Sequence, residues 1–314
     1  MSARQKMTLQ QLAASALRKQ LRKLSREADR VCSGDNIEAL HQVRVVVRRL
    51  RSALTVFAGC FPEKQRRSWR KALRRLTRGL GRPRDLDVQI ALVHGILDKC
   101  GDAALRPGID RLLLRLRQRR AGLSGRMERA LARFAQDRVN DQMLAAAETL
   151  AARRAPSAAA SPDPRAACRG AILGALADLA AYRQCLLNPD DAQRHHAMRI
   201  RAKRLRYALE VCSEAYGRRL KPMIDAARTL QTLLGDLHDG DLWLSDLAAF
   251  EAAERQRTKE YFGHDRPFAR LKPGLDHLAA DRRQRRDQIF HALGAAWRAI
   301  EQRGVWTKLA ALLD

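Results

Sequence analysis

The chain has 314 residues, 46% of them hydrophobic, so it can build cores for two ordinary domains and is not a disordered polymer. It carries 61 Lys and Arg against 34 Asp and Glu, a formal net charge of +27. The positive electrostatic potential of such a surface favours a polyanionic partner. Only eleven of these cations are Lys and fifty are Arg, whose planar guanidinium matches phosphate oxygens. A genome rich in G and C would also favour Arg, but it would not suppress Asp and Glu.

The cysteines and the apolar segments indicate in which cellular compartment the protein resides. No Cys-x-x-Cys pair occurs, so we expect small core residues in a reducing cytosol, at positions 32, 60, 100, 168, 185 and 212. No run approaches 18 apolar residues. We therefore expect a cytoplasmic protein that does not enter a membrane.

Apolar residues recur at three- and four-residue spacing along nearly the whole chain, which predicts an all-α fold. Turn signals predict where helices break. In the first half they lie at 33–35, 59–62, 79–83, Gly101 and 107–108, and in the second at 188–189, Gly217, Gly235, Gly240, 263–267 and 273–274. Each half then holds about four long helices, as expected of an antiparallel bundle.

A Pro/Ser/Ala segment at 153–166 cannot hold a helix across its prolines, so we predict a linker there. This places the first four-helix bundle at 1–152 and the second at 167–314.

An internal repeat relates the two halves. His41–Leu54 reads HQVRVVVRRLRSAL and His196–Leu209 reads HAMRIRAKRLRYAL, with seven identical positions at a shift of 155 residues. A second motif, Leu-x3-Leu-Gly-x3-Asp-x-Asp, begins at Leu76 and again at Leu230. A shorter match, Arg-Gln-Arg-Arg, occurs at 117–120 and again at 283–286. Two copies of one bundle account for these matches.

Each repeat carries a ridge of cations on one helix face and apolar residues on the opposite face. The first ridge is His41, Arg44, Arg48 and Arg51, and the second is His196, Arg199, Lys203 and Arg206. The apolar faces are Val43, Val47, Leu50 and Leu54 in one helix and Met198, Ala202, Leu205 and Leu209 in the other. A ridge of about 15 Å suits several successive phosphates. We expect both ridges to lack acidic neighbours one turn away and to face a shared groove.

The following helix alternates cations with Trp69, Leu73, Leu76 and Leu80, and its cations are Arg67, Arg70, Lys71, Arg74 and Arg78. Its counterpart keeps Lys221 and Arg228 but places Asp225 opposite Lys71, so we expect the halves to be unequally charged. Two acidic pairs, Asp85 with Asp87 and Asp239 with Asp241, resemble metal or acid/base pairs. We interpret them instead as helix caps or as supports that fix neighbouring guanidinium groups, and we expect no metal.

These residues resemble the conserved histidine α-helical domain (CHAD) family. The resemblance rests on His41-x2-Arg44-x3-Arg48-Arg49-x-Arg51, on Leu80-Gly81-x3-Asp85-x-Asp87 and on their repeats, and it covers about residues 6–314. It implies two four-helix bundles related by a pseudo-two-fold axis, with a basic groove or cavity that binds inorganic polyphosphate, and association with polyphosphate granules. Some relatives carry a fused triphosphatase with a Glu-x-Glu-x-Lys strand, which does not occur here.

The ridges and the resemblance together predict a non-catalytic binding protein that needs no cofactor. The predicted polyphosphate-binding residues are His41, Arg44, Arg48, Arg49, Arg51, Arg74, Arg78, His196, Arg199, Lys203, Arg204, Arg206 and Arg228. Val46 stands where the second half has Arg201, and Arg84 stands where it has His238. The two halves are therefore expected to grip the ligand unequally.

Two alternatives stay open. The charge also suits a nucleic-acid binder, although aromatic residues are only 5% and no helix-turn-helix is present. A phosphoryl-transfer enzyme would need metal-holding carboxylates and a phosphate loop, and no G-x4-G-K-[ST] sequence occurs.

Overall fold

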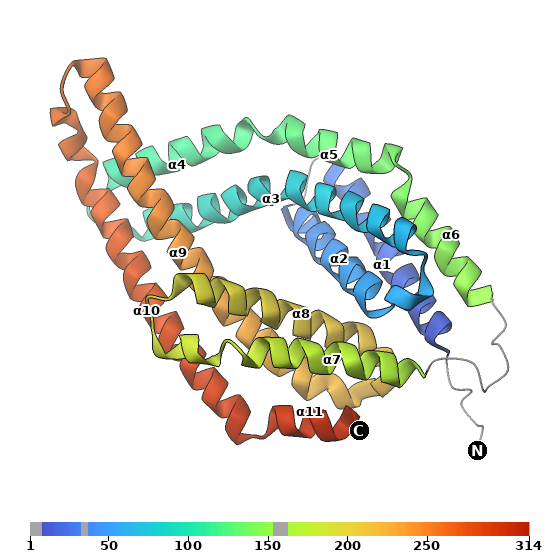
Figure 1. Ribbon diagram of the computed structural model, residues 1–314. Helices are drawn as coiled ribbons and strands as arrows, with labels where there is room; N and C mark the ends of the chain where they lie inside the picture. Colours follow the sequence, from blue (N-terminus) through green and yellow to red (C-terminus); the bar gives the residue numbers. More distant parts are fainter. Residues whose placement is uncertain (1–7, 33–36, 153–162, 314) are drawn as a thin grey trace.

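The computed structural model describes residues 8–32, 37–152 and 163–313, and in these ranges all the regular secondary structure is helical (Figure 1). The all-α prediction is confirmed for this part of the chain. The predicted turn at 33–35 and the linker up to residue 162 lie outside the described residues. Beyond them, the predicted linker end at 166 is wrong, because Asp163 caps a helix that begins at Pro164.

In the first half, α2 lies between α1 and α3. Its helices are α1 (Leu9–Cys32), α2 (Ile37–Val56), α3 (Glu63–Lys99), α4 (Arg106–Ala121), α5 (Ser124–Gln136) and α6 (Val139–Ala152), with a short 3-10 segment η1 (Ala58–Cys60). Helix α1 packs on α2 and α6, and α3 packs on α2, α4 and α5.

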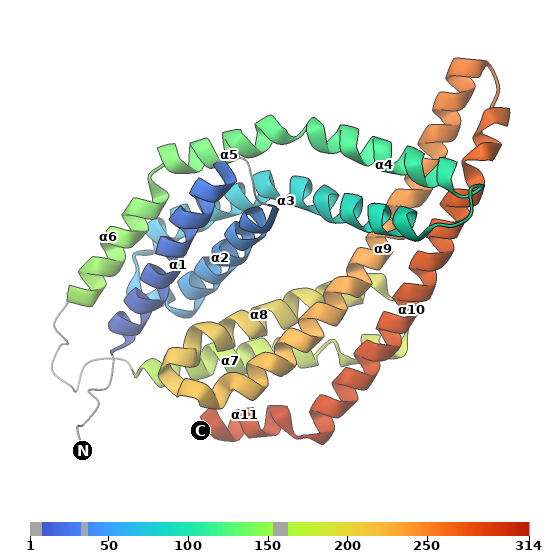
Figure 2. The same cartoon turned by 180° about the vertical axis from the view of Figure 1, so that it is seen from behind.

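The second half places α8 between α7 and α9. Its α-helices are α7 (Pro164–Ala180), α8 (Ala192–Tyr216), α9 (Lys221–Phe262), α10 (Lys272–Gln302) and α11 (Val305–Leu313). Three 3-10 segments join them: η2 (Arg183–Leu187), η3 (Gly217–Leu220) and η4 (Arg266–Arg270). In Figure 2, α9 and α10 run side by side and project beyond the other helices.

Three predicted breaks are wrong. The Gly79–Pro83 segment lies inside α3, and Gly235 and Gly240 lie inside α9. The reason is burial, because Leu76 and Leu80 in α3 and Leu230 and Leu234 in α9 are almost fully buried and hold both helices through the glycines. Other predicted breaks coincide with helix ends, including Gly217 and Gly263, which both have positive φ.

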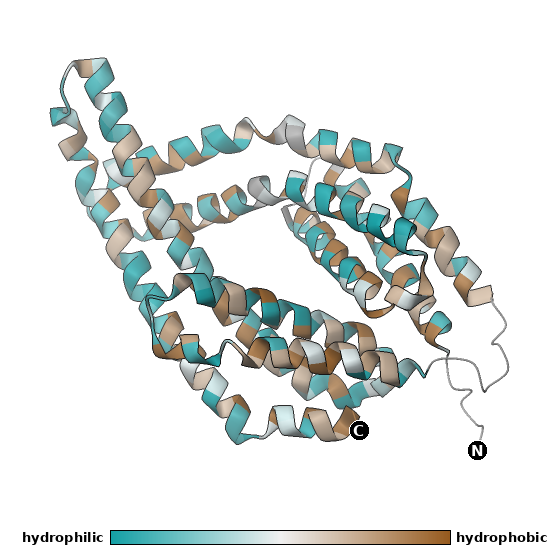
Figure 3. Ribbon diagram, viewed as in Figure 1, coloured by the Kyte–Doolittle hydropathy of each residue, from teal (hydrophilic) through white to brown (hydrophobic). Residues whose placement is uncertain are grey.

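A large core runs through both halves, since α2 packs directly on α8. Its largest buried side chains include Trp69 and Phe57. Hydrophobic and hydrophilic residues alternate along the helices in Figure 3, as expected of amphipathic helices around a core.

A second core joins the ends of four helices from both halves. It is formed by Leu86, Val93 and Leu97 of α3, Ile109, Leu112, Leu113 and Leu116 of α4, Trp243, Leu247 and Phe250 of α9, Phe268, and Leu275 and Leu278 of α10. At its edge Gly108 and Gly274 meet, and a Cβ on Gly108 would clash with the Leu271 carbonyl oxygen. The halves are therefore held together at two places, by α2 on α8 and by this core.

Candidate anion-binding surface

The two ridges lie on α2 and α8, the helices that pack against each other across the halves. All four predicted apolar residues of each helix are buried, at 0% exposure. The predicted buried faces are therefore confirmed. Burying these faces stabilises each helix by about 2 kcal/mol per large aliphatic side chain, and it fixes which way the ridges point.

Lys203 of the α8 ridge lies within electrostatic reach of the α2 ridge. Burial, then Arg199 on its own helix, then Arg48 and Arg44 on α2 lower the pKa of Lys203 to about 7, while Asp239 acts in the opposite direction. The two ridges thus come together, and like charges from both halves meet around Lys203.

Arg48 and Arg51 have buried guanidinium nitrogens without partners. In the described residues, neither Nε atom has a hydrogen bond. Burial, followed by the charges of Arg74, Arg70 and Arg204, lowers the pKa of Arg51. Arg51, which is partly desolvated and lies near three other cations, is therefore a favourable place for an anion.

Arg44 is held against α3 at Gly81. Its Nη1 donates to the Leu80 carbonyl oxygen at 3.2 Å, and its Nη2 lies 3.6 Å from Asp85 Oδ1. A Cβ on Gly81 would stand 3.2 Å from Arg44 Nη1. The repeat places Gly235 beside Arg199 in the same manner, with 3.9 Å between a Cβ and Nε. Both glycines lie beside an arginine of another helix, but only at Gly81 would a Cβ come unusually close to it.

His196 contacts His238, a residue outside the predicted set. The His196 Nδ1 atom lies 3.1 Å from His238 Nε2. Burial, Arg199 and Lys203 lower the pKa of His196. Burial, Arg199 and His196 lower the pKa of His238 to about 4. Both lowered pKa values favour the neutral imidazole, and an anion bound nearby would favour the charged form.

The acidic pairs lie within α3 and α9, so the interpretation as helix caps is wrong. The interpretation as arginine supports agrees with their contacts. Asp87 Oδ1 accepts from Arg120 Nε at 2.7 Å, and Asp241 Oδ1 accepts from Arg286 Nε at 2.5 Å. These matched ion pairs tie α3 to α4 and α9 to α10. Burial and the charges of Asp236 and Asp85 raise the pKa of Asp239.

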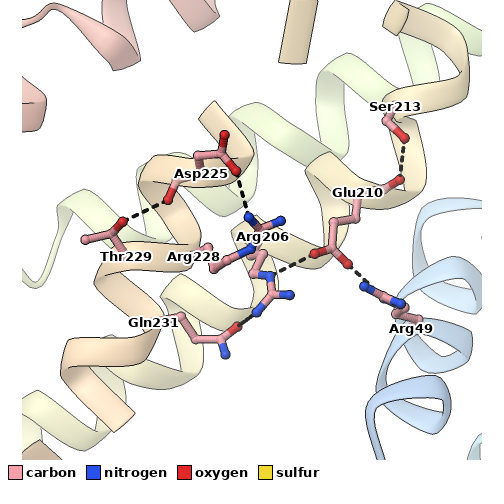
Figure 4. Close-up of polar contacts among 8 residues, drawn as sticks. All are labelled: Arg49, Arg206, Glu210, Ser213, Asp225, Arg228, Thr229 and Gln231. Carbon is pink, nitrogen blue, oxygen red and sulfur yellow. Dashed lines mark hydrogen bonds and ion pairs between the residues drawn. The ribbon is translucent and has the colours of Figure 1, made fainter. Parts of the chain in front are cut away.

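The expectation that the ridges lack acidic neighbours is wrong at Arg206. Glu210 follows it by one turn, and its Oε1 accepts from Arg206 Nε at 2.8 Å (Figure 4). The other oxygen accepts from Arg49 Nε at 2.9 Å, so one carboxylate joins both halves. The second ridge is thus partly neutralised at its C-terminal end.

The remaining predicted residues differ in exposure and in their partners. Arg74 and Arg78 are exposed on α3, and His41 is half-buried on α2. Arg204 pairs with Asp178 at 3.6 Å, and Arg228 pairs with Asp225 at 2.8 Å. These two cations are already balanced by local carboxylates.

Sequence reasoning left Arg70 out of the predicted set. It lies close enough to Arg51 to lower its pKa, and its own pKa is lowered by burial, Arg66, Arg74 and Arg204. The signal was present, because Arg70 precedes Arg74 by one helical turn and points to the same side of α3.

In the described ranges, no group of three His, Cys, Asp or Glu side chains is placed to hold a metal ion, and no helix is long and apolar enough to cross a membrane. Cys168, Cys185 and Cys212 are buried as predicted, whereas Cys60 and Cys100 are half-buried.

Comparisons with known proteins place this architecture. The CHAD domain family model matches residues 15–248. The fold is similar to the crystal structure of the CHAD domain from the plant Ricinus communis, with a TM-score of 0.63 and 24% identity over 95% of this chain and 94% of that chain. It is also similar to PptA from Streptomyces chartreusis, with a TM-score of 0.59 and 19% identity over 93% and 99% of the two chains. No curated protein matches. Since the family model spans well over half of the sequence, the chain belongs to the CHAD domain family.

Proposed function

We propose that this protein binds inorganic polyphosphate, without chemical reaction, along the facing ridges of α2 and α8. In this proposal the halves act as two copies of one four-helix bundle related by a pseudo-two-fold axis, and the ligand lies in the groove between them. Binding at polyphosphate granules in the cytoplasm is part of the same proposal.

The observation that carries the proposal is the group of cations around Lys203. Arg44, Arg48 and Arg199 all act on it, and only Asp239 opposes them. Four cations in one partly buried place repel each other, which costs free energy in the unbound protein. A flexible chain of phosphates would remove this cost, and it would add charge-assisted hydrogen bonds to the unpartnered Nε atoms of Arg48 and Arg51.

Restricted access favours a bare phosphate chain over a nucleic acid. The side chains of Arg44 and Arg206 are only 19% and 15% exposed. Bases need free aromatic faces on which to stack, but Tyr207, whose ring lies 5.6 Å from the Arg206 guanidinium carbon, is buried.

A chain-length series tests the proposal. Binding of triphosphate and of chains with tens of phosphates is measured by calorimetry at several salt concentrations. We expect affinity to rise with chain length and to fall steeply with salt, because several phosphates are neutralised together. Equal affinity for triphosphate and long chains would contradict a groove. Displacement of polyphosphate by single-stranded RNA at equal phosphate concentration would favour the nucleic-acid alternative.

A further inference from the structure

A cavity of about 640 Å³ lies among α1, α2, α8, η3 and α9, and its lining is distinct from the centre of the ridges. Arg49 and Arg228 line it, whereas Arg48 and Lys203 do not. Glu210 stands at the boundary, because it lines the cavity and accepts from both Arg49 and Arg206 (Figure 4). Two of the predicted polyphosphate-binding residues, Arg49 and Arg228, therefore belong to this cavity and not to the centre of the ridges.

The cations of the cavity outnumber its acids. The lining contains Lys19, Arg49, Arg218, Lys221 and Arg228, against Glu210, Glu214 and Asp225. Asp225 accepts from Lys221 at 3.4 Å and from Arg228 at 2.8 Å, and Glu210 accepts from Arg49. Within the described chain, Lys19 and Arg218 have no hydrogen-bond or ion-pair partner, and both side chains are exposed. Two cations are thus available to one anionic group.

The rest of the lining is mostly apolar. Ala16, Ala53, Val211 and Ile224 contribute to it, and the first three are buried. Gln20 also lines the cavity, and its amide oxygen is buried without a hydrogen-bond partner among the described residues. An apolar surface beside a few polar groups and a cationic edge is typical of pockets for small organic anions, and the volume falls in their usual range.

We propose that this cavity is a separate binding site for a small organic phosphate ester of nucleotide size. Lys19 and Arg218 hold the phosphate, the organic body lies against Ala53 and Val211, and a hydroxyl or amino group of the ligand donates to the Gln20 oxygen. An inorganic phosphate chain has no organic body and cannot use this part of the lining. The site is thus distinguished by chemistry from the ridges.

Calorimetry with ADP, adenosine and inorganic phosphate tests the site on the full chain. We expect saturable binding of ADP and much weaker binding of the other two, since adenosine lacks the charge and phosphate lacks the body. The double variant K19A/R218A should weaken ADP binding by roughly tenfold or more, because two charge-assisted contacts are lost. Ile224→Trp, which fills the cavity from a half-buried position, should weaken it as well.

The control removes the same charge elsewhere. K259A/R283A changes two exposed cations that do not line the cavity and should leave ADP binding within about twofold of wild type. Both double variants remove two positive charges outside the ridges, so polyphosphate affinity should change equally in the two. ADP binding thus reports on the cavity and polyphosphate binding on the ridges, and the two proposals can fail independently. The proposal is overturned if ADP does not saturate below roughly 1 mM, if K19A/R218A binds ADP as the control does, or if adenosine binds as tightly as ADP.

Discussion

Arg49 of α2 and Glu210 of α8 are joined by a hydrogen bond of 2.9 Å between Nε and Oε2, although they come from opposite halves of the chain. Their side chains are 28% and 14% exposed. Arg206 occupies the other carboxylate oxygen, so Glu210 balances one cation from each half. Glu210 therefore joins the two halves, and it is also the carboxylate with which a bound polyanion would compete.

Glu210→Gln should therefore strengthen polyphosphate binding and weaken the fold. Removing the carboxylate frees Arg206 of the second ridge for phosphate and breaks the contact with Arg49, and it should lower the free energy of unfolding by about 1–3 kcal/mol, between the values for exposed and buried ion pairs. Calorimetric titration and urea denaturation measure the two effects. Glu214→Gln, the same change one turn later at an exposed side chain, should do neither. Weaker polyphosphate binding in Glu210→Gln would contradict this account.

Lys203 should make binding depend on pH. Its pKa in the unbound protein is about 7, below the ordinary 10.5, and a bound polyanion favours the ammonium form. Binding then takes up a proton, so affinity should fall as pH rises from about 7 to 9. Lys203→Arg keeps its charge throughout this range and should show a flatter profile. If polyphosphate affinity fell with pH equally steeply in wild type and in Lys203→Arg, Lys203 would not be part of the binding site.

The same pKa predicts an effect on stability. Between about pH 7 and 10.5 the unfolded chain holds a proton on Lys203 that the folded protein has lost, so this residue's contribution to the free energy of unfolding rises with pH. Lys203→Met should be more stable than wild type near pH 6.5, and the advantage should shrink by pH 9. Chemical denaturation at both pH values measures this difference in the free energy of unfolding. A difference that grows with pH would contradict a lowered pKa of Lys203.

The two glycines beside arginines should respond differently to alanine. Gly235→Ala adds a Cβ at an ordinary 3.9 Å from Arg199 and should stabilise α9 by roughly 0.5–1 kcal/mol, with unchanged polyphosphate affinity. Gly81→Ala adds one 3.2 Å from Arg44 Nη1, which is fixed by Leu80 and Asp85. It should displace Arg44 and reduce polyphosphate affinity a fewfold. Thermal denaturation and titration of both variants check this, and identical behaviour would show that Gly81 does not position Arg44.

Asp241→Asn should destabilise the protein by about 3 kcal/mol, because the buried Arg286 would lose its close carboxylate partner and keep only the distant, exposed Asp287. Asp287 provides the control. It lies 3.7 Å from the same guanidinium but its side chain is 64% exposed, so Asp287→Asn should cost less than about 1 kcal/mol. Urea denaturation compares the two, and equal losses would show that burial does not decide the strength of this pair.

The sequence was sufficient for features that depend on one helix at a time. Periodicity predicted that Val43, Val47, Leu50 and Leu54 are buried and that the cations lie on the opposite face, because position along a helix fixes direction around it. Turn chemistry found Gly217 and Gly263, where positive φ requires glycine.

Features that depend on which surfaces meet were not predictable in the same way. The sequence predicts helix breaks at Gly81 and Gly235, yet each of these glycines lies within a helix and beside an arginine from another helix. The core shared by α3, α4, α9 and α10, and the contact between His196 and His238, arise from segments distant in sequence. Glu210 was visible one turn after Arg206, but its bond to Arg49 was not.

The most direct test removes four ridge cations together. Polyphosphate is titrated at several salt concentrations against wild type and against a variant with Arg48, Arg51, Lys203 and Arg206 changed to Ala. The matched control changes four exposed cations away from the ridges: Lys259, Arg266, Arg270 and Arg283. We predict that the ridge variant loses at least roughly a hundredfold in affinity and that its salt dependence becomes shallower, while the control stays within a fewfold of wild type. Equal losses in the two variants would mean that polyphosphate responds to net charge alone, and would contradict a site between α2 and α8.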